Sequence, residues 1–270
     1  MIFSAAATFL ALSVAAIAAP ISPAQTVALH HRAEYDGIEI CGVQGRENGL
    51  DKKCLLNPLQ FYIENGQFKS STKAGPKIDE TAQCDHSLEL QVLARSLENY
   101  GACRALNAIV SAAGLTGNGG SEFKKTVMLP LLQAINDQSN AVWLPQSVNS
   151  VKGAVVKSAL GNGGDTDASP ATLANVKTYF ADPRIHTKTV ALAAQLDTLT
   201  GQMLTAAAAA GNRALDANTK LGSGRGASAK KTAQERIAAA VTTWQDAFTA
   251  HHDGVASEWQ IVMDHVAAHP

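Results

Sequence analysis

The sequence predicts a mostly helical α+β protein. Two observations support this class. Apolar residues recur at helical spacing through most of residues 88–160 and 172–267. Short β-favouring runs bounded by turn residues occur in residues 33–80 and again at 141–144. We therefore expect a small amount of β-structure together with a larger set of helices.

Residues 1–19 have the character of a secretory signal. An apolar run extends to Ala19, with small residues before Pro20, and it is too short for a comfortable membrane span. Its amino end lacks the usual positive charge. A pro-segment over residues 20–33 is the accompanying hypothesis, because His31-Arg32 resembles a weak dibasic processing site. These features predict a secreted, extracellular protein.

All four cysteines, Cys41, Cys54, Cys84 and Cys103, lie in the first half of the chain. An even number in a secreted protein predicts two disulfides. Three connectivities are possible, and the favoured one has the shortest loops, pairing Cys41 with Cys54 and Cys84 with Cys103. A zinc site is the alternative, although no two cysteines show the two-residue spacing that zinc sites usually have.

The formal net charge is −1 at pH 7. A protein that coats nucleic acid is strongly basic, so any contact of this chain with a polyanion has to be local. The most basic zone spans residues 213–236, around a glycine-rich linker at 221–228. A solvated loop between helices is the favoured interpretation, and a phosphate-contacting arm is the other.

The periodicity and the turn residues also predict an order of elements. Strands are expected at 37–41, 60–63 and 141–144, and helices at 88–113 with a break near 99–101, 123–135, 147–160, 172–180, 187–210 and 232–267. Residues 114–120 are expected to form a loop, and Ser147 to cap the helix that follows it. The expected organisation is a disulfide-braced domain at 34–165 and a helical region at 166–270.

Two sequence blocks carry chemistry: residues 84–91, beginning Cys84-Asp85-His86, and residues 140–153. Hydrolysis of a phosphodiester needs a base for water, stabilisation of the charge on phosphate and neutralisation of the leaving oxygen. A neutral imidazole can be the base, and a hard cation bound by oxygen ligands can do the rest. An Asp-His pair on a strand points its side chains to opposite faces, and an Asn on a helix across the strands can add a further oxygen.

Together and in this order, the two blocks resemble the core of the HNH (His-Me finger, ββα-metal) nuclease family, in the variant whose third motif residue is Asn. Asp85-His86 matches the end of the first strand, Asn140-Ala141-Val142 the start of the second, and Ser147–Gly153 the start of the helix. The match covers roughly residues 80–160 and implies a small ββα-metal-type core with a helical insert. The insert is longer than usual in the family, and the zinc-knuckle cysteines of many members are absent.

The resemblance implies a role for each motif residue. His86 would be the general base, and Asp85 and Asn149 would bind the metal. Asn140 would hold the loop between the strands by backbone hydrogen bonds. Lys152 would contact phosphate. The implied cofactor is a divalent cation, Mg²⁺ or Mn²⁺, and the implied substrate is DNA or RNA.

Glu89 has no fixed counterpart in the family. It lies near the Asp-His pair and is expected to contact the metal ligands without binding the metal itself. Three functions stay open on the sequence. The favoured one is a secreted metal-dependent endonuclease, because nothing structural requires the Asp-His and Asn-Lys sets together. The second is a non-enzymatic effector or toxin-like interaction protein on the same skeleton, which the near-neutral charge favours. The third, a helical carrier of small apolar molecules, rests only on the apolar helices.

Overall fold

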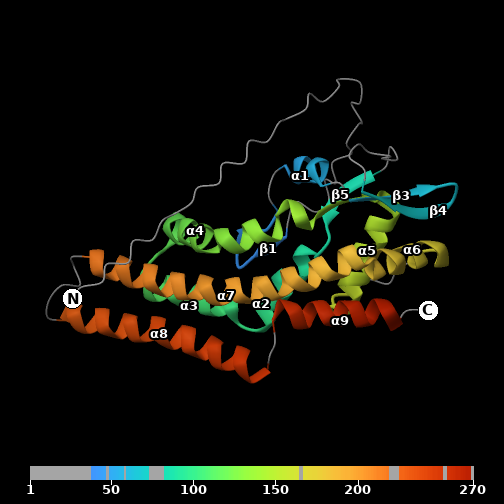
Figure 1. The fold of residues 1–270 in the computed structure, drawn as a ribbon. Coiled ribbons are helices and arrows are strands. Elements are labelled where there is room, and N and C mark those ends of the chain that lie inside the picture. The colour runs from blue at the N-terminus through green and yellow to red at the C-terminus, as the bar shows by residue number, and fades with distance from the viewer. Residues whose placement is uncertain are drawn as a thin grey trace, which may run out of the picture.

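The computed structural model describes residues 38–46, 49–57, 59–72, 82–163, 167–218, 225–251 and 254–268. The predicted signal and pro-segment lie outside these residues. Within the described ranges the chain is mostly helical and carries two small sheets, which confirms the α+β class (Figure 1). None of the described helices is long and apolar enough to cross a membrane.

The strands form a two-stranded and a four-stranded sheet. The first pairs β1 (Glu39–Ile40) with β2 (Val43–Gln44); the second contains β3 (Gln60–Glu64), β4 (Gln67–Ser71), β5 (Ala82–His86) and β6 (Ala141–Pro145) in the order β4-β3-β6-β5. The predicted turn after β3 is present, because Asn65 and Gly66 both adopt positive φ, at 53° and 73°. β3 and β6 are parallel, whereas the other neighbours are antiparallel.

Helices cover both faces of the four-stranded sheet. On one face, α1 (Leu50–Leu56) packs on a small cluster that includes Cys84 and Trp143. On the other face, Val142 and Leu144 of β6 enter the main core with the long helices. Since side chains alternate along a strand, the register of Asp85 opposite Val142 puts Asp85 on the side of the main core.

The predicted pair of helices after β5 is confirmed, with its break at Tyr100-Gly101. The helices are α2 (Leu90–Asn99), α3 (Ala102–Ala112), α4 (Gly117–Ile135), α5 (Gln146–Ala159), α6 (Pro170–Ala181), α7 (Pro183–Ala217), α8 (Arg225–His251) and α9 (Val255–Ala268). A short 3-10 turn, η2 (Gln138–Asn140), precedes β6. The main core draws on helices from both of the predicted regions.

Three details of the sequence prediction are wrong. The expected loop at 114–120 ends early, because α4 already begins at Gly117. Ser147 is not the cap of α5, because that helix begins at Gln146 and Pro145 holds the cap position. The single helix expected at 232–267 is two helices, α8 and α9.

The start of α9 has a physical cause in another helix. The carboxylate of Asp197 on α7 accepts hydrogen bonds from the backbone N–H groups of Val255 (2.6 Å) and Ala256 (3.1 Å). A carboxylate that binds the first amides of a helix caps it and complements its dipole. The periodicity of residues 232–267 contains no trace of this distant cap.

The disulfide pairing with the shortest loops is also wrong. The bonds are Cys41–Cys103 and Cys54–Cys84. Cys84 faces α1 from the edge strand β5, so Cys54 of α1 is the cysteine beside it. Cys41, in the β1–β2 turn, belongs with Cys103 of α3 to the main core. Two pairs on different faces of the sheet therefore replace two pairs that are close in sequence.

Candidate functional site

The two motif blocks come together in β5, β6 and α5. β5 and β6 are antiparallel neighbours, and α5 follows β6 without a loop. Asn140 joins this unit to the start of α2: its amide oxygen accepts from the N–H of Leu88 at 2.7 Å, and its amide nitrogen donates to the carbonyls of Leu88 (3.1 Å) and Ile135 (2.8 Å). The side chain of Asn140 thereby fixes the loop that follows His86.

Asp85 lies among cations. Its side chain is 1% exposed, and its carboxylate is 3.1 Å from the guanidinium of Arg46 and 3.3 Å from the ammonium of Lys152. An unpaired charge on this face of β5 would be buried in the main core at a cost of several kcal/mol. The two cations compensate the carboxylate, and Arg46 reaches it from the segment after β2.

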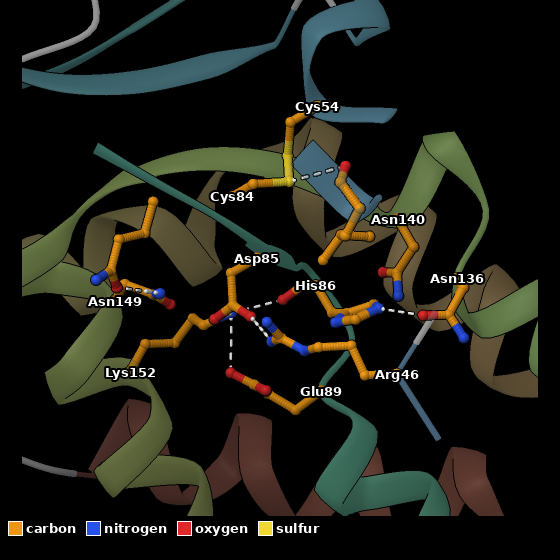
Figure 2. A network of polar contacts seen from close by, with 12 residues as sticks. Arg46, Cys54, Cys84, Asp85, His86, Glu89, Asn136, Asn140, Asn149 and Lys152 are labelled. Atoms are coloured by element: carbon orange, nitrogen blue, oxygen red, sulfur yellow. Dashed lines mark hydrogen bonds and ion pairs between the residues drawn. A yellow bond between two sulfur atoms is a disulfide. The ribbon is translucent and has the colours of Figure 1, made fainter. Parts of the chain in front are cut away.

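Lys152 is the centre of the group (Figure 2). It is fully buried, and its ammonium lies 2.9 Å from the carboxylate of Glu89, 3.3 Å from that of Asp85 and 2.5 Å from the carbonyl oxygen of His86. The contacts with the two carboxylates are ion pairs, and the ammonium donates a hydrogen bond to the His86 carbonyl. The ring of Tyr179 completes the surroundings, with its centroid 5.6 Å from the ammonium.

The four charged side chains balance each other. We call Arg46, Asp85, Glu89 and Lys152 the ion-pair cluster; it contains two carboxylates and two cations. Burial alone would lower the pKa of Lys152, but the carboxylates of Asp85 and Glu89 outweigh this effect and hold the pKa above its ordinary value. Lys152 is therefore charged at neutral pH.

His86 is held by different partners from its neighbour Asp85. Its ring is fully buried, and Nε2 lies 3.0 Å from the amide oxygen of Asn136 at the end of α4. The amide nitrogen of Asn136 donates to the carbonyls of Gly45 and Leu132, so its oxygen is left to accept. Nε2 of His86 consequently carries the proton, and Nδ1 has no hydrogen-bond partner among the described residues.

Burial lowers the pKa of His86 to about 4, against an opposing effect of the Asp85 carboxylate. The imidazole is therefore neutral at pH 7. A proton binds more tightly to the unfolded chain, where the pKa of the group is 6.5, than to the folded chain. As the pH falls from 6.5 to 4, the folded protein should lose about 3 kcal/mol of stability through this group, with no further loss from it below pH 4.

The pH prediction is checked by urea unfolding at a series of pH values. His86→Gln keeps a side-chain donor but does not titrate, so its stability should fall less steeply than that of the wild type between pH 6.5 and 4. His186→Gln is the matched control, because His186 is exposed on α7. Parallel curves for the wild type and His86→Gln would contradict the prediction.

Asn149 lies apart from the ion-pair cluster (Figure 2). It is fully buried on α5, and its amide nitrogen donates to the side-chain oxygen of Gln83 at 3.0 Å. Gln83 and Asp85 share one face of β5, and Asn149 and Lys152 are one helical turn apart on α5. The two contacts, Asn149 to Gln83 and Lys152 to Asp85, therefore fasten α5 across the strand.

The residues do not fit a divalent cation in this arrangement. Across the described ranges, no three His, Cys, Asp or Glu side chains are gathered in a way that could hold a metal ion. Asp85, the expected ligand, already lies between two side-chain cations, and Glu89 is bound to one of them. A metal ion at Asp85 would meet the ammonium of Lys152 at the distance of an ion pair, where like charges repel strongly.

Four residues of the site were missed by sequence reasoning: Arg46, Gln83, Asn136 and Tyr179. Gln83 directly precedes the first motif block, so the alternation of a strand could have placed it beside Asp85. Arg46, Asn136 and Tyr179 come from other elements and carry no local signal.

Comparison of the chain with family models, curated proteins and solved structures gives no match.

Proposed function

We propose that this chain is a secreted, non-enzymatic interaction protein of the effector or toxin-like kind, in which a nuclease-like constellation serves stability rather than catalysis. The observation that carries the proposal is the position of Lys152. Its ammonium bridges Asp85 and Glu89 in the fully buried place where the resemblance leads one to expect a metal ion.

Burial of the other motif residues supports the same proposal. Asp85, His86, Asn140 and Asn149 are each at most 2% exposed, so a polymer substrate cannot reach them in this conformation. A general base has to lie within hydrogen-bond reach of its substrate or water. The two disulfides support secretion, because such bonds persist in oxidising compartments.

A metal-dependent endonuclease acting on DNA or RNA is the second candidate. The observation that favours it is the order and pairing of β5, β6 and α5, with His86 at the end of the first strand. His86 is neutral and has Nδ1 without a partner among the described residues, as a general base requires. This candidate would need a second conformation in which Arg46 and Lys152 leave Asp85.

The experiment incubates the purified, disulfide-intact protein with plasmid DNA and with total RNA, in Mg²⁺ or Mn²⁺ and then in EDTA. We expect no metal-dependent cleavage beyond that of the His86→Gln variant. We also expect the melting temperature of the wild type to be unchanged by Mn²⁺, since a ligand stabilises a protein only if it binds the folded state.

Cleavage that disappears both with EDTA and in His86→Gln would overturn the proposal and establish the second candidate. The variant has to be shown to be folded by circular dichroism before the comparison is made. Cleavage that survives in folded His86→Gln would indicate a contaminating nuclease, and a repeat on separately purified protein then decides the result.

A further inference from the structure

A groove with a volume of about 740 Å³ lies between α3 and α8, and its lining contains none of the motif residues. The two helices run in opposite directions (Figure 1). A Cβ added at Gly211 of α7 would lie 3.2 Å from both Ile109 of α3 and Ile237 of α8, which places these two residues opposite each other. From Arg236 to Ala247 the groove extends about 16 Å along α8, at about 1.5 Å of rise per residue.

The groove is open because its walls carry small side chains. Its wall on α3 includes Ala105, Ala108 and Ala112, and its wall on α8 includes Ala239 and Ala240. Such walls line the groove with methyl groups along both helices, an apolar surface that suits an alkyl chain.

An aromatic side chain gives the groove a fixed wall. Trp244 is 6% exposed and stacks on Phe248 with ring centroids 5.2 Å apart. A Cβ at Gly201 of α7 would lie 3.5 Å from the same indole, so α7 supports the ring from behind. The indole therefore presents a rigid apolar surface to whatever enters the trough.

The charged side chains of the lining are both cationic: Arg104 on α3 and Arg236 on α8. Both are exposed, and neither forms an ion pair with any residue that the structure describes. Given the pairing of Ile109 with Ile237, the two arginines are about 9 Å apart along the groove. A guanidinium binds a carboxylate with two parallel hydrogen bonds.

The carboxylate that contacts two residues of the lining is already compensated by its partners. Glu258 of α9 accepts hydrogen bonds from Asn99 and Tyr100 at 3.1 Å each, and Arg95 lies 3.5 Å from it. The charged side chains of the lining itself are the two arginines. An anion is therefore favoured there, and a cation is not.

We infer that the groove binds an amphipathic anion of the long-chain carboxylate class. The unbranched tail lies between the alanines of α3 and α8 against Trp244, and the head group lies at Arg104 and Arg236. The inference rests on the proposed function in treating the chain as a binding protein, and it supplies the class of ligand.

The test titrates the full secreted protein with dodecanoate and follows binding by calorimetry and by the fluorescence of tryptophan. Dodecanol has the same tail without the charge, and butyrate has the charge without the tail. We expect saturable binding of dodecanoate, at least about tenfold weaker binding of dodecanol, and none of butyrate. Absence of saturable dodecanoate binding would overturn the inference, and equal binding of dodecanol would overturn the role of the arginines.

Two variants locate the ligand. Ala108→Trp fills the groove from an exposed position on α3 and should abolish binding, whereas Ala238→Trp, exposed on α8 outside the lining, should leave it unchanged. The double variant Arg104→Gln/Arg236→Gln should weaken binding of dodecanoate to the level of dodecanol. Binding that persists in Ala108→Trp would place the ligand elsewhere and refute the inference.

The result is separable from that of the nuclease assay. If neither binding nor cleavage is observed, the ligand class is refuted and the proposal of a non-enzymatic protein stands. If dodecanoate binds and DNA or RNA is also cleaved, with cleavage lost in His86→Gln, the proposal of a non-enzymatic protein is refuted. The groove then remains a ligand site, because its lining and the motif residues do not overlap.

Discussion

Replacement of Lys152 by methionine is expected to lower the free energy of unfolding by about 3–5 kcal/mol, the range observed when one partner of a buried ion pair is removed. Methionine has a similar length but no charge, so packing against Tyr179 changes little. Asp85 keeps Arg46, whereas Glu89 loses the ammonium that lies 2.9 Å from its carboxylate. The measurement is urea unfolding at pH 7, followed by tryptophan fluorescence.

The matched control is Lys157→Met, on the same helix but exposed. Its stability should stay within about 0.5 kcal/mol of the wild type, as is usual for surface substitutions. A triple variant, Lys152→Met with Asp85→Asn and Glu89→Gln, removes the carboxylates together with the cation and should recover most of the loss. If Lys152→Met is as stable as Lys157→Met, the ion-pair cluster does not form in the folded protein.

The same residue shows what the sequence could and could not predict about the site. The resemblance of the two motif blocks implied that β5, β6 and α5 lie together, and in the structure β5 pairs with β6, which continues directly into α5. Burial was not predictable in this way. The main core around Lys152 includes side chains of α6, the next helix, and of α9, which is remote in sequence.

Burial changes the chemistry expected of each residue. An exposed Lys152 would be free to bind phosphate, but a buried one needs carboxylates, and Asp85 and Glu89 supply them. Arg46 also pairs with Asp85, although it lies after β2 and belongs to neither motif block. The helical periodicity was more informative about the fold, since most helices were predicted in type and order. It did not predict the break between α8 and α9, because the start of α9 depends on Asp197, more than fifty residues earlier.

Loss of a disulfide is the second large effect that we expect. Cys41 and Cys103 are 62 residues apart and Cys54 and Cys84 are 30 apart, so in a chain-entropy description each bond contributes about 4 kcal/mol, the longer loop about 0.6 kcal/mol more than the shorter. The double variants Cys41→Ala/Cys103→Ala and Cys54→Ala/Cys84→Ala are compared with the wild type by urea unfolding under non-reducing conditions.

Single variants test the pairing directly. Cys103→Ala should leave Cys41 as the thiol that a maleimide labels after unfolding, because these two cysteines are bonded. Under the pairing with the shortest loops, the free thiol would be on Cys84 instead, and peptide mapping distinguishes the two.

The two bonds should also differ in what they hold. Cys54–Cys84 ties α1 to the edge strand β5 within a small cluster of its own, so its loss should raise amide hydrogen exchange in α1 first. Cys41–Cys103 lies in the main core, where many apolar neighbours hold the same elements together. Its loss should therefore lower global stability without selective exposure of one helix, and early exchange confined to β1 and α3 would contradict this account.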